Sequence, residues 1–377
     1  MKKYLIFSFI LCFLSCGNAQ KNNNSSATKG ANTSSDGIFK YASGISVRDT
    51  NGTRLVDITD PSGSTSLHYK YALVHKDSSA VNVPEDYAII RTPISKVICM
   101  TSLQLSGFIK LGVTDKIAGI TSTRFLKNAQ LRSRLEDGSL HRIGIEGDFD
   151  AEVVLSIDPD LILISPFKRG GYGAIEDLDI PLLAYMGYKE SDPLGQTEWI
   201  KFVGMLCGKE AEADSLFSEI EERYLKLKAL TADISKRPKI LSGELHSGNW
   251  YVVGGESYLA NIFYDAGAQY FMTNNKESGG FYVDYETVYS QGAETDFWRV
   301  TNNFNGKFSY EALLASDSRY ADFKPFRDKK VVYCSLREKP FYENTPMEPE
   351  VVLADLIHIF HPELLTDHQP VYYELLK

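Results

Sequence analysis

Two stretches of the chain, far apart in sequence, share the same order of features: an acidic opening, a short helix, a break and a strand. The first is DAEVVLSIDPDLILIS at 150–165, and the second is DYETVYSQGAETDFWRV at 284–300. In the first stretch, Pro159 cannot donate into a helical ladder and restricts the residue before it, so the helix must stop there. The uninterrupted apolar run 161–164 then predicts a strand buried on both faces, as in a parallel sheet covered by helices.

Similar units follow one another from Pro93 onward. Strands are predicted in KVICMTS, KIAGITS, LILIS and PLLAY, and helices in LQLSGFIKLGV, at 151–157 and in AIEDLD. A long helix is expected in KEAEADSLFSEIEERYLKLKALTADI, where apolar residues recur at helical spacing. After Lys239 the alternation restarts, in KILSGEL, YLANIFYDAG, FSYEALLA, KKVVYCS and PEVVLADLIHIFHPELL. Alternating strands and helices predict two doubly wound (Rossmann-like) α/β lobes with right-handed crossovers.

The N-terminal residues predict export. MKKYLIFSFILCFLSC joins two lysines to an apolar run too short for a comfortable membrane span, and its end resembles a bacterial lipobox with Cys16 as the lipidated residue. Phe13 departs from the usual Leu, and a generic secretory peptide with an incidental Cys is the alternative. The following residues 16–37 are polar and cannot bury a core, so we expect a flexible tether.

Residues 38–92 are predicted to be β-rich. Asn51 and Gly52 stand between two alternating segments, which is a strong signal for a two-residue hairpin turn, and SLHYKYALVHK and DYAIIRTP supply further strands. The expected organisation is therefore a signal peptide at 1–15, a tether at 16–37, a β-rich extension at 38–92, an N-terminal α/β lobe at 93–192, linking helices at 193–236 and a C-terminal α/β lobe at 237–377.

Charge and cysteine content exclude several classes of protein. A formal net charge of −9 argues against a nucleic-acid binder, which normally has a basic footprint. Cys99, Cys207 and Cys334 each lie in an apolar setting, so we expect buried structural thiols. The sequence contains no CxxC pair, so thiolate zinc sites and iron–sulfur clusters have no ligands, and no metal site or cofactor of the protein's own is predicted.

The order and spacing of these segments resemble the class III substrate-binding proteins of bacterial ABC importers for iron–siderophore complexes, haem and cobalamin, in a lipoprotein form. The likeness covers residues 93–377 and depends on KVICMTSLQLSGFIKLGVTDKIAGITS, AEVVLSIDPDLILIS, ETVYSQGAETDFW and EVVLADLIHIFHPELL. It implies two lobes joined by one long rigid helix, with the ligand in the cleft between them and only modest closure on binding. The extension at 38–92 lies outside that pattern and receives no role from it.

The resemblance also gives a reason for the paired acids. In such proteins a glutamate on each lobe meets arginines of the membrane permease, and by position these are Glu152 and Glu286. A carboxylate and a guanidinium form a bidentate, charge-assisted pair, so two such points would fix the docking orientation. The alternative is helix electrostatics, because a glutamate in a first turn complements the positive end of the helix dipole.

Aromatic and basic residues in the loops that follow the strands are the candidate ligand contacts. Rings offer apolar contact and cations meet carboxylates or phosphate, which suits a large, bulky anionic ligand. His246 could bind haem iron, although one isolated histidine more often does not, and Trp250 could stack on a macrocycle or cover the core of the second lobe. The candidates are Arg124, Phe167, Lys168, Arg169, Tyr172, Tyr188, His246, Trp250, Tyr251, Asn302, Arg337, Phe341 and Tyr342.

Three rival classes remain beside this interpretation. A secreted hydrolase lacks a G-x-S-x-G or H-E-x-x-H motif here, and Glu343 and Glu348 are acids without a fixed separation. A free-metal receptor would need clustered histidines, whereas the seven histidines are dispersed and only His358 and His361 share helical spacing. A surface glycan-binding lipoprotein is compatible with the tether and the abundant tyrosine.

The expected function is that of a non-enzymatic, monomeric receptor in the periplasm, held to the membrane through its lipid. It captures a metal chelate (a ferric siderophore, haem or cobalamin) and delivers it to an ABC permease, with transport energy from the partner ATPase.

Overall fold

The first lobe is built on a parallel sheet. The computed structural model describes residues 37–377 except 51, 79–82, 122–125, 146 and 167–170. Five parallel strands lie in the order β11-β10-β5-β6-β7, and the Leu161–Ile164 run is buried throughout, as its unbroken apolar sequence predicts. The elements of this lobe are β5 (Val97–Cys99), α1 (Ser102–Lys110), η1 (Thr114–Lys116), β6 (Ile117–Ile120), α2 (Ala129–Glu136), β7 (His141–Arg142), β8 (Gly144–Ile145), β9 (Asp148–Phe149), α3 (Ala151–Ile157), β10 (Leu161–Ile164), η2 (Gly173–Ile175), β11 (Leu182–Ala184) and η3 (Gly187–Lys189).

The second lobe repeats this plan with two additions. Its main sheet has the order β15-β12-β17-β18-β19, parallel except for β19, and a separate antiparallel sheet has the order β13-β14-β16. The elements are β12 (Lys239–Ser242), β13 (Glu244–His246), β14 (Asn249–Val253), α6 (Tyr258–Asp265), β15 (Gln269–Tyr270), β16 (Gly280–Val283), α7 (Tyr285–Gly292), β17 (Phe297–Asn302), α8 (Tyr310–Ser316), η4 (Ser318–Asp322), α9 (Lys324–Arg327), β18 (Val331–Ser335), α10 (Phe341–Asn344), η5 (Thr345–Met347), α11 (Pro349–Phe360) and β19 (Glu374–Leu375).

A further pair of acids shows how closely the two sheets correspond. Asp160 stands just before β10 and accepts the backbone N–H groups of Ser95 and Lys96. Asp296 stands just before β17 and accepts the backbone N–H of Lys239 at 2.9 Å. Each aspartate therefore links the beginning of one strand to the beginning of its parallel neighbour. The two lobes share this hydrogen-bonding arrangement as well as their order of elements.

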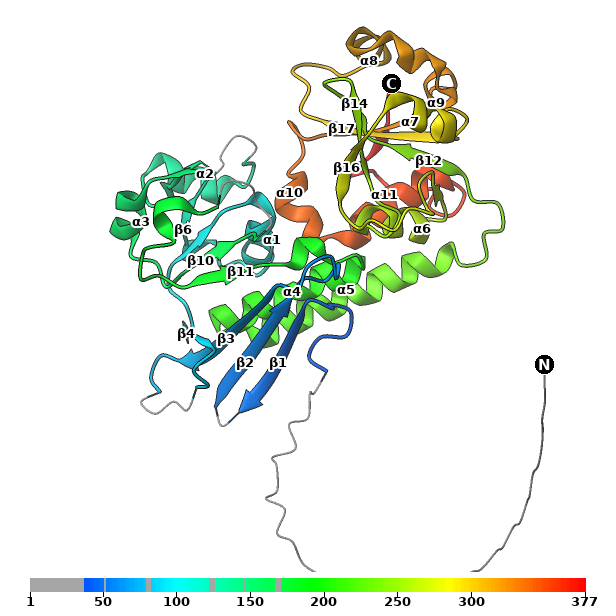
Figure 1. Cartoon of the computed structure of the whole chain (residues 1–377). Helices are drawn as coiled ribbons and strands as arrows, with labels where there is room; N and C mark the ends of the chain where they lie inside the picture. The colour runs from blue at the N-terminus through cyan, green and yellow to red at the C-terminus, as the bar shows by residue number, and fades with distance from the viewer. Residues whose placement is uncertain (1–36, 51, 79–82, 122–125, 146, 167–170) are drawn as a thin grey trace, which may run out of the picture. The chain divides into compact units, whose positions relative to one another are not determined.

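Two helices join the lobes. α4 (Pro193–Cys207) begins at Asp192, whose carboxylate accepts the N–H groups of Leu194 and Gly195, and it ends at Gly208 in the left-handed region (φ +67°). α5 (Glu210–Leu230) is the predicted long helix; it packs against α4 and then against α11 of the second lobe, and Figure 1 shows it running beneath both lobes. This confirms the expected fold of two α/β lobes joined by a long helix.

Residues 38–92 form a four-stranded sheet that shares the core of the first lobe. Its strands are β1 (Ile45–Thr50), β2 (Thr53–Thr59), β3 (His68–His75) and β4 (Ala88–Thr92), in the order β1-β2-β3-β4, with β3 and β4 parallel. β1 and β2 are antiparallel with two residues between them, which confirms the predicted hairpin, and Gly52 has φ +84°. The side chains of Val47, Val56 and Ile58 belong to the same apolar cluster as those of the first-lobe sheet.

Two buried carboxylates hold the start of this extension against the joining helix. Glu198 on α4 accepts the backbone N–H groups of Lys40, Tyr41 and Ala42 at 2.7–2.9 Å and the ammonium of Lys201 at 2.9 Å. Glu190, two residues before the Asp192 cap, accepts the N–H groups of Ser43 and Gly44 and the indole N–H of Trp199. We call residues 40–44 with Glu190 and Glu198 the N-terminal clasp. These contacts attach the extension to the joining helix, which the sequence did not predict.

One predicted helix is wrong. AIEDLD was expected to be helical, but only the 3-10 turn Gly173–Ile175 forms there. Aspartate and glycine are poor helix formers, and Pro181 restricts the residue before it to an extended backbone, so the segment has too few residues for a stable helix.

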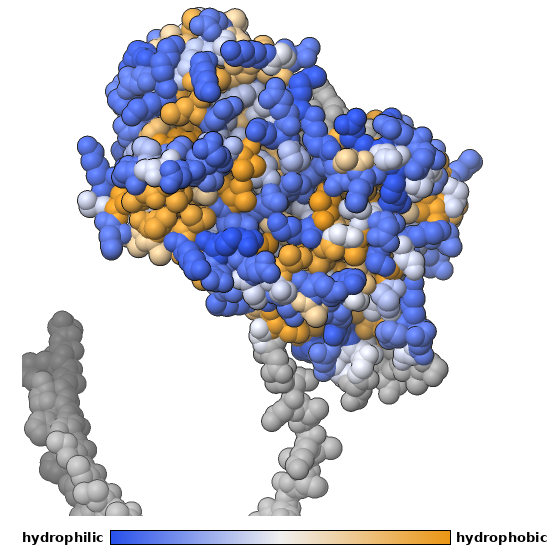
Figure 2. Space-filling view, turned by 180° about the vertical axis from the view of Figure 1, so that it is seen from behind, coloured by the Kyte–Doolittle hydropathy of each residue, from blue (hydrophilic) through white to orange (hydrophobic). Residues whose placement is uncertain are grey.

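The remaining fold predictions concern burial and membrane spans. Cys99, Cys207 and Cys334 are unpaired and buried, as expected, and burial raises the pKa of the Cys334 thiol to about 12. Within the part of the chain that the structure describes, no helix is both long and apolar enough to span a bilayer. On the face seen in Figure 2, polar residues cover most of the surface and apolar residues form separate patches.

Candidate functional site

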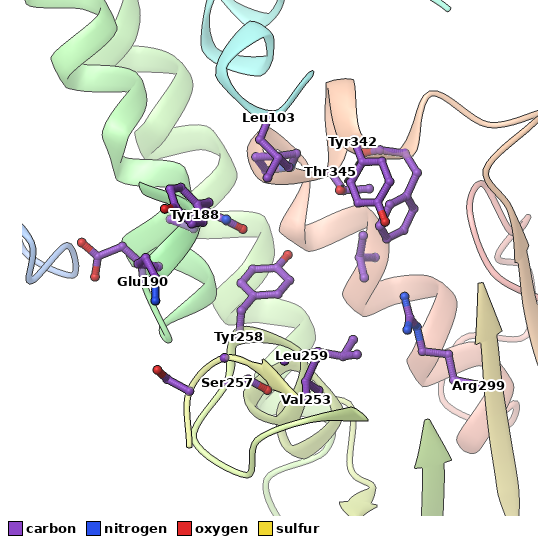
Figure 3. A pocket seen from close by; sticks show the side chains of 18 of the residues that line it. Leu103, Tyr188, Glu190, Val253, Ser257, Tyr258, Leu259, Arg299, Tyr342 and Thr345 are labelled. Atoms are coloured by element: carbon purple, nitrogen blue, oxygen red, sulfur yellow. Dashed lines mark hydrogen bonds between the residues drawn. The ribbon is translucent and has the colours of Figure 1, made fainter. Parts of the chain in front are cut away.

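A cavity of about 500 Å³ lies between the two lobes. On the side of the first lobe and α4, the lining consists of Leu103 from α1, Tyr188 and Lys189 from η3, Glu190 directly after η3, and Gln196 from α4. The second lobe contributes the remaining walls (Figure 3), formed by Tyr251, Val253, Ser257, Tyr258, Leu259, Ser278, Gly279, Gly280, Arg299, Phe341, Tyr342, Thr345, Pro346, Val352 and Tyr373. Because no one lobe supplies the whole lining, the cavity depends on the arrangement of both.

Aromatic rings form much of the second-lobe wall. Tyr251 on β14 and Tyr342 on α10 are each 42% exposed, so their rings are open to a ligand. The Tyr251 ring packs against that of Tyr282 on the next strand, with ring centroids 5.3 Å apart. Phe341, the residue before Tyr342, packs edge-on against Tyr373, with ring centroids 5.8 Å apart. This contact holds the Phe341 ring in place in the cavity wall. Half-exposed rings fixed by their neighbours are suited to contact a bulky or flat ligand.

The polar groups of the cavity are fewer. Arg299, on β17, donates from Nε to the hydroxyl of Tyr373 at 2.9 Å and from Nη1 to Oγ of Ser242 at 3.3 Å. Burial raises the pKa of Tyr373 to about 12, so this hydroxyl stays protonated at neutral pH. Tyr258, on α6, has a buried hydroxyl with no hydrogen-bond partner in the described chain. A cavity lined by aromatic and aliphatic side chains with a few polar groups is the usual composition of a small-molecule site.

One carboxylate ties the lobes together beside the cavity. Glu343 on α10 is buried, and its two oxygens accept the backbone N–H groups of Lys127 and Asn128 from the first lobe at 2.6 and 2.8 Å. Burial raises the pKa of this carboxyl, although the two N–H groups oppose the shift. α10 also packs against α1, so the segment that carries Phe341 and Tyr342 is attached to both lobes.

Glu343 and Glu348, the two acids of the hydrolase alternative, have partners within the fold. Glu343 is used in the contact between lobes just described. Glu348 accepts the hydroxyl of Tyr372 and forms an ion pair with Lys110 at 3.3 Å. His358 and His361 likewise contact the backbone carbonyls of Leu365 and Gly267. Each of these four side chains thus has a structural partner within the fold.

The structure brings four of the predicted ligand contacts together. Tyr188, Tyr251, Phe341 and Tyr342 line the cavity. Five others lie away from its described lining: Tyr172, His246, Trp250, Asn302 and Arg337. The remaining four, Arg124, Phe167, Lys168 and Arg169, fall outside the described residues, as does the predicted lipidation site Cys16.

The burial, hydrogen bonds or exposure of these five residues show where each one lies instead. Trp250 is 0% exposed in the second-lobe core, where its indole N–H donates to the carbonyl of Ser242 and leaves no surface for a ligand. Asn302 bonds Glu244 and Tyr333, and Tyr172 donates its N–H to Glu176. His246 is the last residue of β13 and Arg337 lies two residues after β18, and both are exposed to solvent. We therefore do not propose these five as contacts.

Sequence reasoning missed Arg299, Tyr258 and Tyr373. Arg299 carried a usable signal, because a charged residue in the otherwise apolar run Phe297–Val300 is unusual in a buried strand. Tyr258 at the start of α6 and Tyr373 before β19 carried none, since a tyrosine in an apolar segment is usually a core residue.

Glu152 and Glu286 occupy equivalent positions in the two lobes. α3 begins at Asp150, whose carboxylate accepts the N–H of Val153 at 3.0 Å, and α7 begins at Asp284, which accepts the N–H of Thr287 at 2.8 Å. Each glutamate is the second residue of its helix and is exposed to solvent. An aspartate already caps each helix, so helix capping does not require the exposed glutamate that follows.

Two α/β lobes, a joining helix and a cavity between the lobes define the class of two-lobed binding proteins. The family model described as periplasmic binding protein matches residues 97–336, and the chain belongs to this family.

The chain is also similar to individual proteins and solved structures. An uncharacterized lipoprotein of Methanocaldococcus jannaschii is 23% identical over 86% of this chain and 82% of its own length. Among solved structures, a molybdate periplasmic binding protein of Haemophilus influenzae, bound to molybdate, has a TM-score of 0.59 and 18% identity over 74% of this chain and 89% of that one. A periplasmic haem-binding protein of Pseudomonas aeruginosa has a TM-score of 0.58 and 17% identity over 75% of this chain and 97% of that one. These identities establish a shared fold.

Proposed function

We propose that this protein is the lipid-anchored substrate-binding component of an ABC importer. It captures a metal chelate (a ferric siderophore, haem or cobalamin) between its lobes and delivers it to a membrane permease, whose ATPase supplies the energy. The observation that carries this proposal is the cavity of about 500 Å³ lined by aromatic side chains from both lobes. That volume falls within the range of roughly 300–1,000 Å³ usual for small-molecule sites.

The ligands of related folds support a metal-containing cargo. One structural neighbour is a haem-binding protein and another binds molybdate. The cavity is surrounded by Phe341 and by five tyrosines, Tyr188, Tyr251, Tyr258, Tyr342 and Tyr373. Rings of this kind offer apolar contact to a macrocycle or to the aromatic arms of a chelator. Affinity then comes from a preformed surface, and the protein leaves its ligand chemically unchanged.

A titration tests this proposal. Purified protein is titrated with haemin, cobalamin, a ferric hydroxamate and a ferric catecholate, while visible absorbance and tryptophan emission are recorded. At least one chelate is expected to saturate at one molecule per chain and to be recovered intact. If all four fail to bind, or if a bound molecule is hydrolysed, the proposed function is wrong.

The position of the two exposed glutamates supports docking to a permease. Glu152 and Glu286 lie at the second position of equivalent helices, one on each lobe, and both are solvent-exposed. Exposed ion pairs contribute little affinity, so these residues should set the orientation and rate of docking more than the total binding energy. Reversing both charges should therefore stop delivery without weakening the capture of ligand.

The experiment compares two double variants. Glu152→Lys with Glu286→Lys is expected to bind the chelate as the wild type does but to abolish import in cells that depend on it. Glu136→Lys with Glu294→Lys changes the net charge equally at one exposed acid on each lobe and should import normally. Normal import by the first variant, or equal loss in both, would remove the docking role of this pair.

The lipid anchor is supported by the sequence of the N-terminus and by a relative. FLSC resembles a lipobox with Cys16 at the modified position. The relative that covers 86% of this chain is described as a lipoprotein. We infer that the folded part of the chain acts outside the cytoplasm, in the periplasm, as a monomer held near the membrane.

A further inference from the structure

The cavity contains an arginine whose charge has no carboxylate partner in the described chain. Arg299 projects from β17 toward the space between Tyr258 and Tyr342 (Figure 3). Its hydrogen bonds go to the neutral hydroxyls of Tyr373 and Ser242, and its guanidinium carbon lies 5.4 Å from the centre of the Tyr373 ring. These contacts orient the guanidinium but do not neutralise it.

Several other arginines of the described chain pair directly with a carboxylate. Arg223 pairs with Glu350 at 3.0 Å, and Arg48 pairs with Asp57 at 2.9 Å. Glu244 is the carboxylate whose charge acts on Arg299, yet it forms no ion pair with it and accepts instead from the side-chain amide of Asn302 at 3.3 Å. Burial raises the pKa of Glu244, although Asn302, His246 and Arg299 oppose the shift. Arg299 is partly buried, and a cation that is partly removed from water without a countercharge is unfavourable, so this position favours a partner outside the chain.

A second unpaired donor faces the same space. The hydroxyl of Tyr258 is buried and has no hydrogen-bond partner among the described residues, and Tyr258 lines the cavity. In Figure 3 its ring extends from α6 into the centre of the cavity, between Tyr188 and Tyr342. Burial raises the pKa of Tyr258 well above its ordinary value, so the hydroxyl remains an O–H donor. A buried hydroxyl without a partner is rare and calls for an acceptor.

We propose that Arg299 and Tyr258 form a recognition site for an anionic oxygen, so the ligand of this cavity is an acidic molecule that presents a carboxylate or a comparable oxyanion to the second lobe. The guanidinium uses one Nε–H and one Nη1–H on protein groups, which leaves its Nη2 edge for the ligand. A fixed fork of N–H donors together with an O–H donor matches the acceptors of a carboxylate. This inference rests on the proposed function and adds the charge of the cargo to it.

The test uses ligands matched in size but different in charge. Haemin, which carries two carboxylates, is compared with its neutral dimethyl ester, and a ferric catecholate with a neutral ferric hydroxamate. Molybdate and inorganic phosphate are titrated separately. A charge-assisted hydrogen bond contributes about 1.5–3 kcal/mol, so the wild type is expected to prefer the acidic member of a pair by roughly ten- to a hundredfold.

Three variants locate the source of that preference. Arg299→Leu should abolish it, and Tyr258→Phe should reduce it about threefold to tenfold, because the ring stays and only the O–H is lost. Arg337→Leu removes an exposed cation of the same lobe that lies outside the described lining and should leave the preference unchanged. If Arg299→Leu does not fold, the comparison of acidic and neutral ligands on the wild type still tests whether the cavity prefers an anionic ligand.

The outcomes separate this inference from the proposed function. Equal affinity of the wild type for acidic and neutral chelates overturns the inference and leaves the importer role standing. Binding of molybdate or phosphate that depends on Arg299, without binding of any chelate, supports the inference and removes the chelate as cargo. If no acidic ligand binds but a neutral chelate does, the inference is overturned and the importer role stands; if no chelate of either kind and no oxyanion binds, both are overturned.

Discussion

Removing the carboxylate of Glu198 should destabilise the whole folded unit, because it is the centre of the N-terminal clasp. The side chain is 0% exposed and accepts three successive backbone N–H groups, from Lys40, Tyr41 and Ala42, as well as the ammonium of Lys201. In Glu198→Ala these donors lose their acceptor, and residues 38–44 must either leave them unpaired or detach from α4.

The size of the loss follows from these contacts. A hydrogen bond to a charged group contributes about 1.5–3 kcal/mol, but bonds to one carboxylate are not additive. Removing one partner of a buried charge pair costs about 3–5 kcal/mol, and detachment of the segment limits the loss. Lys201 keeps its bond to the carbonyl of Ile38 at 2.8 Å. We therefore expect Glu198→Ala to lower the free energy of unfolding by about 3–5 kcal/mol.

Urea unfolding followed by circular dichroism measures this loss, and hydrogen exchange of the peptide that covers residues 38–44 locates it. Glu222→Ala on the neighbouring helix is the control. Glu222 is exposed and pairs with the exposed Lys226, so no measurable change is expected. The exchange of residues 40–42 should accelerate in Glu198→Ala alone. A free energy of unfolding within about 1 kcal/mol of the wild type, with unchanged exchange, would refute the reasoning.

Two further predictions concern the cavity and the contact between lobes. Tyr251→Ala removes a half-exposed ring of the cavity and should weaken chelate binding by roughly 1 kcal/mol, or about fivefold, whereas Tyr264→Ala, an exposed tyrosine outside the described lining, should not; equal affinities of the two variants would contradict this. The raised pKa of Glu343 means that this carboxyl binds its proton more tightly in the folded state than in the unfolded state. Its contribution to the free energy of unfolding therefore increases as the pH falls through the folded-state pKa toward the ordinary value of 4.5. The difference in free energy of unfolding between the wild type and Glu343→Gln should therefore shift in favour of the wild type over that window, and a difference independent of pH would contradict the prediction.

The fold was largely predictable because its signals are local. Pro159 sets the end of α3, the apolar run Leu161–Ile164 indicates a covered parallel strand, and Asn51 with Gly52 indicates a hairpin. The clasp was not predictable, since Glu190 and Glu198 meet residues 40–44 from about 150 positions away in sequence, and a glutamate in a helix carries no sign of a distant partner.

The site was predictable only in part for the same reason. Tyr188, Tyr251, Phe341 and Tyr342 follow or flank strands, where this fold places its ligands, and the structure brings them to one cavity. Trp250 alternates with Tyr251 along β14 and so faces the opposite side, into the core, a distinction that requires the register of the strand. Arg299 and Tyr258 meet only through the packing of β17 and α6 around the cavity.

The central claim is that the space between the lobes is where the ligand binds, and a structure of the complex tests it most directly. Crystals grown with the tightest-binding chelate should show one molecule between Tyr188 of the first lobe and Tyr251 and Tyr342 of the second, with an anionic oxygen on Arg299. A chelate bound on the outer surface of either lobe, with this cavity filled only by solvent, would contradict the account.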